Sequence, residues 1–352
     1  MIHVLLLLGC AVVIYLACEW FVNAVEWFGV EFKVGAVAVG TILAAAGTAL
    51  PESVVTLVAV LFGNKAQGSN EIAVGAAMGG PLVVGTIAYG VTGAMLLLHK
   101  RKRAKVGASV TAGGGSAADV PEEFRDRGLA EVDTKRLAKD QTWFLVIFAF
   151  KVALGLIAFS IKPALGVLFF AAYAVYFWRE MRAEGDDASS EGLEPLKFQR
   201  RRGTPARWAL IAQTLATLMV IFGASQLFVR QLEWAGPALG LSPVVVALLL
   251  SPIATELPEI LNAIIWVRAG KTQLALANIS GAMMIQATVP SGIGILFTPW
   301  KFDAPLLLAG VVTAAAISYL LWMLRTRNLT PVKLTATAGF YVAFAVGLVF
   351  TA

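Results

Sequence analysis

The sequence predicts an all-α membrane protein, with ten transmembrane helices in two inverted five-helix repeats whose core helices are broken. Composition is the first observation behind this prediction. Of the 352 residues, 58% are hydrophobic and 14% are charged, against about 45–50% and about 25% in soluble domains. A chain this apolar needs a bilayer as its solvent, which excludes soluble enzymes and disordered proteins. Cys10 and Cys18 share one apolar run, which excludes a disulfide framework.

The spacing of the apolar runs is the second observation, because each run is about long enough to cross a bilayer. The expected spans lie at about 3–25, 34–62, 71–98, 141–159 and 163–179, then at about 208–230, 242–267, 273–297, 304–324 and 332–351. The chain is therefore divided into 1–98 (helices 1–3), a 99–140 cytoplasmic loop, 141–179 (helices 4–5), a 180–207 cytoplasmic linker and 208–352 (helices 6–10).

The distribution of the 28 lysines and arginines predicts the orientation. With the N-terminus outside, Lys65, Lys162, Arg230 and Lys301 are external, Lys151 lies within the fourth span, and all the others are cytoplasmic. This bias follows the positive-inside rule. We therefore expect a multi-pass cell-membrane protein with both termini external. The net charge of +6 reflects topology and does not indicate binding to nucleic acid.

An internal repeat is the third observation. ACEWFVNAVEWFG at 17–29 aligns with ASQLFVRQLEWAG at 224–236, and GTALPE at 47–52 aligns with ATELPE at 254–259. Because each repeat holds five spans, an odd number, the second copy enters the membrane in the opposite sense. Inverted repeats of this kind are typical of secondary transporters, whose ion sites lie at the repeat interface near the bilayer midplane.

The aligned motifs place two glutamates, Glu52 and Glu259, at equivalent depths in the membrane, each directly after a proline. A carboxylate there costs about 2.5 kcal/mol or more and indicates a functional site. Each proline removes an N–H and frees the carbonyl four residues earlier, and Thr48 and Thr255 add hydroxyls. Together the halves offer an all-oxygen cage, which suits Ca²⁺ with its 6–8 oxygen ligands. The alternative is that each glutamate only caps a half-helix.

These motifs also carry a family resemblance. GTALPE and ATELPE resemble the paired GTSLPE signatures of the sodium/calcium exchanger family, within the cation/Ca²⁺ antiporter superfamily, and the chain resembles its prokaryotic ten-helix members. IAVGAAMGG at 72–80 and LALANISGA at 274–282 are similar to the glycine–asparagine helices of that family. The resemblance implies exchange of Ca²⁺ against Na⁺ or H⁺ by alternating access, in which the first and sixth spans slide across the core.

By this resemblance Glu52 and Glu259 hold the divalent ion, and Thr48 and Thr255 complete its shell. Several positions depart from the pattern. Ala49 and Glu256 stand in place of serines, as do Gly80 and Ala282; Val84 and Gln286 replace an asparagine or aspartate; Asn278 is kept, whereas Ala76 loses the equivalent asparagine. The expected ion-site residues are Glu52, Glu259, Thr48, Thr255, Glu256, Gln286 and Asn278.

The departures concern the coupling ion, because the Na⁺ sites of the family use the missing serine and asparagine oxygens. Glu256 adds a third carboxylate, which either carries a proton or another cation, or attracts cations from a vestibule. Lys151 is either an internal counter-cation for the carboxylates or a lysine that snorkels to a polar crevice.

The sequence therefore predicts an antiporter that is not an enzyme, with no cofactor and no obligate protein partner, whose partners are the lipid bilayer and the transported cations. A Na⁺/H⁺ exchanger on the same fold is the main alternative. A cation channel and an intramembrane hydrolase with two carboxylates are the others. Channel filters are usually symmetric rings of subunits, and every aspartate of this chain lies in a polar loop.

Overall fold

A computed structural model describes residues 2–62, 69–112, 129, 132–157, 161–182, 193–201, 203–238, 249 and 251–351. Within these ranges the regular elements are all helical. The first half holds α1 (Ile2–Glu31), α2 (Ala36–Ala38), the π-helix η1 (Val39–Ala44), α3 (Ala45–Phe62), α4 (Ser69–Val83), the π-helix η3 (Val84–Ala88), α5 (Tyr89–Ala112), α6 (Thr134–Leu156), the 3₁₀-helix η6 (Lys162–Leu165) and α7 (Gly166–Arg182). The second half holds the 3₁₀-helix η7 (Lys197–Gln199), α8 (Arg207–Ala238), α10 (Ser251–Thr255), α11 (Leu257–Arg268), α12 (Thr272–Phe297), α13 (Ala304–Arg325), α14 (Pro331–Thr335) and α15 (Ala338–Thr351).

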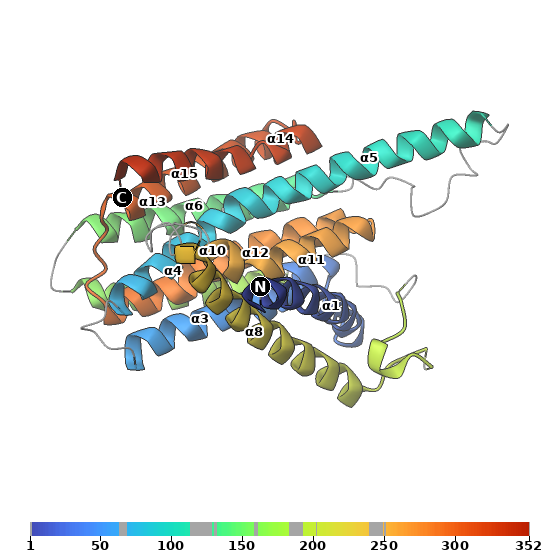
Figure 1. Ribbon diagram of the computed structural model, residues 1–352, viewed down its shortest axis with the longest axis horizontal. Helices are drawn as coiled ribbons and strands as arrows, with labels where there is room; N and C mark the ends of the chain where they lie inside the picture. The colour runs from blue at the N-terminus through green and yellow to red at the C-terminus, as the bar shows by residue number, and fades with distance from the viewer. Residues whose placement is uncertain are drawn as a thin grey trace.

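Seven helical stretches in the described part of the chain are long and apolar enough to cross a bilayer. The predicted all-α membrane fold is thus confirmed. The expected spans 34–62 and 141–159 correspond to η1 with α3 and to α6. The start of the expected span 242–267 lies outside the described residues. These elements are compatible with ten spans. Helix α5 continues to Ala112, and its end projects beyond the other helices (Figure 1).

Local sequence signals set several helix starts. Asp133 caps α6 by accepting hydrogen bonds from the backbone N–H groups of Lys135 and Arg136. Asp303 caps α13 in the same way by accepting from the N–H of Leu306 at 3.0 Å. Such caps satisfy donors that have no partner inside the helix. Asp133 and Asp303 lie between a polar connection and the helix that follows it. Each cap residue therefore marks the start of its helix.

The connections between helices meet at two ends of the bundle. Two ion pairs join three connections that are predicted to be cytoplasmic, Glu31 with Arg207 and Glu26 with Lys271, each at 2.5 Å. At the other end, Lys162 Nζ donates to the carbonyl of Trp300 at 3.1 Å, which joins two connections predicted to be external. This grouping agrees with the alternation of sides that the predicted spans require.

Helix α12 forms the centre of the bundle. Every residue from Ala275 to Thr288 is buried, and α12 packs against α3, α4, α6, α7 and α11 (Figure 1). A helix that is buried on all sides needs small residues where neighbouring backbones approach closely. The glycines and alanines of α12 meet this need, so the second glycine-rich motif lies at the core of the fold.

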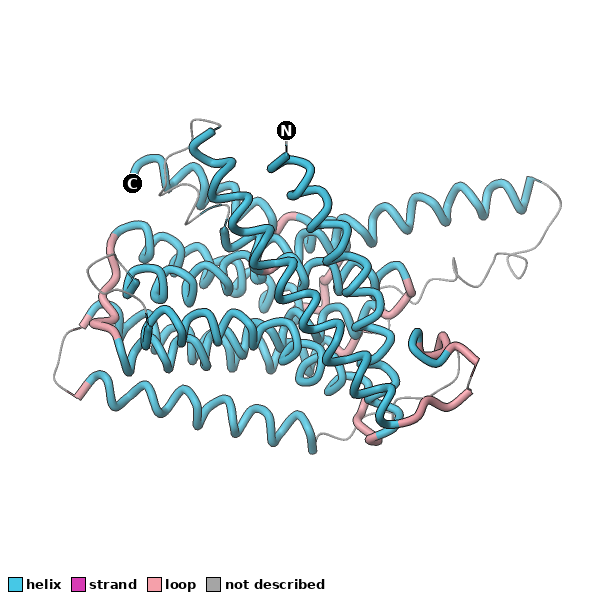
Figure 2. Tube along the Cα trace, turned by 60° about the horizontal axis from the view of Figure 1, so that its bottom comes forward, coloured by secondary structure: helices cyan, strands magenta, loops and turns pink. Residues whose placement is uncertain are grey.

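Helices α1 and α8, the first helices of the two repeats, pack side by side (Figures 1 and 2). Their outer faces expose large apolar side chains such as Leu8 and Met219. Exposed apolar surface on a long helix is what a bilayer covers. The exposed faces of α1 and α8 are therefore expected to contact lipid, and the pair lies on one side of the core helices (Figure 1).

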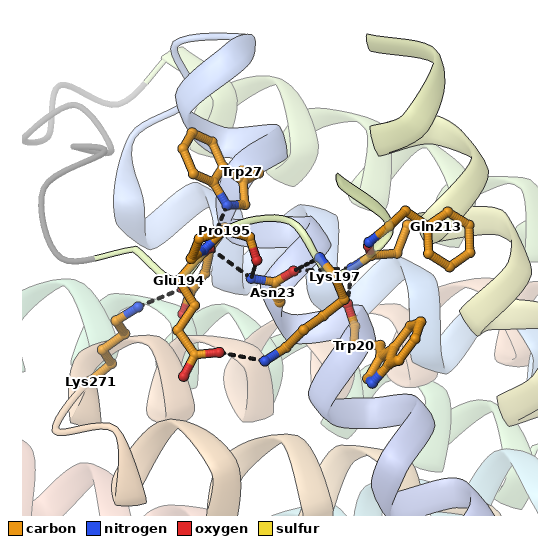
Figure 3. A network of polar contacts seen from close by, with 10 residues as sticks. Trp20, Asn23, Trp27, Glu194, Pro195, Lys197, Gln213 and Lys271 are labelled. Carbon is orange, nitrogen blue, oxygen red and sulfur yellow. Dashed lines mark hydrogen bonds and ion pairs between the residues drawn. The ribbon is translucent and has the colours of Figure 1, made fainter. Parts of the chain in front are cut away.

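The described part of the linker between the repeats docks on α1 and α8 through polar contacts (Figure 3). Asn23 Nδ2 and Trp27 Nε1 of α1 donate to the carbonyl of Glu194 at 3.1 and 2.8 Å. Gln213 of α8 is fully buried; it donates to Asn23 Oδ1 at 3.1 Å and accepts from the Phe198 N–H at 2.9 Å. One amide side chain thus ties both helices to the linker.

Gln213→Ala should loosen this attachment. The variant leaves the Phe198 N–H without its acceptor, and an unsatisfied buried group costs about 1–3 kcal/mol. We expect a melting temperature lower by a few degrees and faster tryptic cleavage after Lys197. Thr214→Ala is the matched control, because that hydroxyl donates only within α8, to the carbonyl of Leu210. Equal cleavage rates in the two variants would show that Gln213 does not hold the linker.

Candidate functional site

The second LPE motif lies at a helix break. Helix α10 ends at Thr255, α11 begins at Leu257, and Glu256 lies between them with φ −89° and ψ 6°. Pro258 has no N–H, so the carbonyl four residues earlier loses its helical donor. Glu256 and Glu259 are buried, with 0% and 1% of their surface exposed. Two buried carboxylates and irregular backbone therefore occur within one turn, as the sequence predicts for this half.

The first LPE motif has a different backbone. Helix α3 runs without interruption from Ala45 to Phe62, and the irregular turn comes earlier, in the π-helix η1. The expected break at the first proline is therefore replaced by a π-helical turn before the motif. Such turns insert an extra residue and are frequent at functional sites. The side chain of Glu52 lies outside the described residues, so its predicted role stays a prediction.

The Glu256 carboxylate contacts residues of both repeats. Gln286 Nε2 of α12 donates to Glu256 Oε2 at 2.5 Å. A Cβ on Gly80 of α4 would lie only 3.0 Å from Glu256 Oε1 and 3.1 Å from Gln286 Cδ. A side chain at this position would crowd the pair, so Glu256 and Gln286 would have to shift by a few tenths of an ångström to make room for it. Since Glu256 is fully buried, it does not face an open vestibule in this structure.

Elements near the motif of each repeat pack against the glycine-rich helix of the other repeat. In the first half, η1 packs against α12. A Cβ on Gly40 of η1 would lie 2.8 Å from Ala277 Cβ and 3.3 Å from the Asn278 backbone nitrogen. In the other direction, Pro252 of α10 lies within 2.7 Å of a Cβ built on Gly79 of α4. Each motif helix thus meets the other repeat, which forms the interface where inverted-repeat transporters bind ions.

Among the described residues, each predicted threonine ligand donates one hydrogen bond to a backbone carbonyl three or four residues earlier. Thr48 is buried and donates to the carbonyl of Ala44 at 3.2 Å. Thr255 is half-buried and donates to the carbonyl of Pro252 at 3.1 Å. A hydroxyl that donates within its own helix keeps its lone pairs for another group. Both oxygens can therefore accept a cation without losing an existing bond.

Two buried asparagines carry amides without hydrogen-bond partners among the described residues. Asn278 of α12 is predicted to be a site residue, and Asn262 lies one turn after Glu259 on α11; neither is exposed. Unsatisfied buried polar atoms are rare and usually mark an ion or water. Asn262 is not among the site residues predicted from the sequence. Its spacing of three residues from Glu259, on the same helical face, is the signal that could have found it.

Helix α1 lies across both LPE motifs. Cys18 Sγ donates to the carbonyl of Pro258 at 3.9 Å. One turn further along α1, the Phe21 ring packs on Gly47, so that a Cβ there would lie 3.0 Å from Phe21 Cε2. A movement of α1 along its axis would therefore change what covers the two motifs at the same time.

The described side chains contain no group of three or more His, Cys, Asp or Glu in metal-binding geometry. What they do contain is a mixed oxygen set of two carboxylates, two hydroxyls and amides from Asn278, Asn262 and Gln286. Hard cations take carboxylate, carbonyl and hydroxyl oxygens rather than nitrogen or sulfur. The oxygens of these side chains are therefore of the chemical type that a hard cation takes.

Buried carboxylates at the interface of inverted helical repeats define a multi-pass membrane transport protein. The chain belongs to the sodium/calcium exchanger protein family, whose model matches residues 2–181 and 209–350. Family membership places it among ion exchangers and not among enzymes.

Individual relatives agree with this assignment. The chain is 28% identical over 141 residues to the putative antiporter CaxA of Alkalimonas amylolytica, which covers 39% of this chain and 44% of that protein. It is 25% identical over 310 residues to the inner membrane protein YrbG of Escherichia coli (strain K12), covering 85% and 81%. The sodium-calcium exchanger NCX_Mj, soaked with 2.5 mM Na⁺ and 0.1 mM Ca²⁺, matches in fold with a TM-score of 0.72, 17% identity and 99% coverage of both chains.

Proposed function

We propose that this protein is a secondary active antiporter that exchanges Ca²⁺ against Na⁺ or H⁺ by alternating access, with both termini external. The observation that carries the proposal is the buried pair of Glu256 and Glu259 at the helix break, with Glu256 next to Gly80 of the other repeat. Glu52, Thr48, Thr255 and Asn278 would complete the Ca²⁺ shell from both halves. The name of the relative NCX_Mj, a sodium-calcium exchanger, supports the same ions.

Glu256 is the residue that we assign to coupling. Its carboxylate accepts a hydrogen bond from Gln286 Nε2 at 2.5 Å, and it is fully buried. A carrier that takes up a proton when Ca²⁺ leaves needs such a group. Hydroxyl oxygens of the kind that bind Na⁺ in the resembling family are absent at Gly80 and Ala282.

The test is ⁴⁵Ca²⁺ uptake into proteoliposomes, driven in separate arms by an outward Na⁺ gradient and an outward H⁺ gradient. We expect saturable uptake that requires the counter-ion gradient. In Glu256→Gln, H⁺-driven uptake should fall to the level of protein-free vesicles. Glu31→Gln is the control, because Glu31 pairs with Arg207 at the end of the bundle.

Each outcome decides between the alternatives. Ca²⁺ flux without a counter-ion gradient or saturation would indicate a channel. No Ca²⁺ uptake under either gradient, together with Na⁺-driven movement of protons, would replace the proposal with monovalent exchange on the same fold. H⁺-driven uptake that survives in Glu256→Gln would remove Glu256 from the coupling step.

A further inference from the structure

Lys151 lies in α6 with none of its surface exposed. Its ammonium does not snorkel to an interface. Instead, Nζ donates to the carbonyl of Ala77 on α4 at 2.8 Å and to Ser291 Oγ on α12 at 3.1 Å. Burying a charged side chain inside a membrane protein costs free energy, and hydrogen-bond acceptors around the ammonium offset that cost. These two acceptors belong to opposite repeats, and the Phe148 ring of α6 lies 4.9 Å from Nζ.

The first partner is a carbonyl that a proline has freed. Pro81 lies inside α4, and a helical proline cannot donate to the carbonyl four residues earlier, which is that of Ala77. Freed carbonyls inside a membrane are tolerated only where other groups satisfy them. Secondary transporters use such carbonyls to coordinate monovalent cations. In this chain a side-chain ammonium takes that position.

The second partner repeats the arrangement on α12. Pro290 lies inside that helix and frees the carbonyl of Gln286, which accepts a hydrogen bond from Ser291 Oγ at 3.2 Å. The side chain of Gln286 in turn donates to Glu256. Lys151 is therefore connected to the Glu256 carboxylate through Ser291 and Gln286, and it joins the two proline-kinked helices of the core.

We propose that the Lys151 ammonium is a tethered monovalent cation, which permanently occupies a cation site formed by the Ala77 carbonyl and the Ser291 hydroxyl. Removing the side chain would leave a site that accepts a small free cation with N–H donors. The consequence for coupling, one monovalent ion fewer to carry in each cycle, rests on the proposed antiport. The cation site itself does not.

The test is chemical rescue of Lys151→Ala, read as the melting temperature of the purified protein in Ca²⁺-free buffer. Loss of a buried, hydrogen-bonded charge should lower the melting temperature by about 10 °C. Propylammonium, which replaces the missing atoms, should restore most of this loss. Tetramethylammonium has the same charge without an N–H donor, and propanol has a similar chain without a charge; neither should rescue. Wild type should respond to none of them.

Lys151→Met fills about the same space as lysine without the charge. It therefore separates the loss of the charge from the loss of packing that a cavity would cause. It should melt below wild type, should not respond to propylammonium and should lose counter-ion-driven uptake. Wild-type melting and uptake in Lys151→Met would overturn the proposal, and so would a Lys151→Ala protein that propylammonium does not stabilise. If Lys151→Ala yields no folded protein, Lys151→Met decides. Wild type that melts as expected but moves no Ca²⁺ would refute the antiport and leave the rescue result standing.

Discussion

Glu259→Gln should lower Ca²⁺ affinity by at least about 100-fold and abolish ⁴⁵Ca²⁺ uptake. Even residues that only orient metal ligands cost about 10- to 100-fold in affinity when they are replaced, and Glu259 is a buried carboxylate at the helix break. Glutamine keeps the shape and one oxygen but removes the charge. Affinity is measured by isothermal titration of the purified protein, and uptake is measured in proteoliposomes.

The same substitution separates ion binding from a purely structural role. Glu259 is the third residue of α11, a position where glutamine serves nearly as well as glutamate in capping a helix. A capping glutamate would therefore tolerate the change. We expect Glu259→Gln to fold and to melt near the wild-type temperature, because glutamine keeps the size and shape of the buried side chain. Wild-type Ca²⁺ affinity in this variant would show that the glutamate only caps α11. Glu31→Gln should behave as wild type in every assay.

Gly281→Ala should strongly destabilise the protein. A Cβ on Gly281 of α12 would overlap the carbonyl oxygen of Thr41 in η1 and lie within 2.6 Å of the Thr41 carbonyl carbon and Cα. Those atoms are backbone and cannot rotate away. Overpacking usually costs about 1–3 kcal/mol, and a clash with backbone at the centre of the bundle should reach the upper end of that range. The expected result is a much lower melting temperature or no folded protein.

Gly9→Ala is the matched control for this prediction. Gly9 is also a helical glycine, in α1, but nothing lies within 4 Å of a Cβ built there. Alanine in a helix interior is favoured over glycine by about 0.5–1 kcal/mol, so the control should melt at or slightly above the wild-type temperature. If Gly281→Ala melts with the control, η1 and α12 separate at little cost. The close approach of the two repeats would then be unimportant for stability.

Several features followed from the sequence because they depend on local physical chemistry. A composition with 58% hydrophobic residues requires a bilayer, and the lengths of the apolar runs follow from its thickness. The repeated LPE motifs predicted inverted halves with glutamates in the membrane, and Pro258 predicted the break that the structure places at Glu256. Each of these inferences needs only the residue types and their spacing along the chain.

Other features depended on which helices meet, and only the tertiary structure decided them. The π-helix η1 precedes the first motif in place of the expected break, and α12 packs against it at Gly281. The sequence left two roles open for Lys151, and the crossing of α4, α6 and α12 resolved its position by bringing Ala77 and Ser291 to the ammonium. These partners lie 74 and 140 residues away along the chain. Residue spacing predicts the local backbone, whereas contacts over such separations depend on how the helices pack.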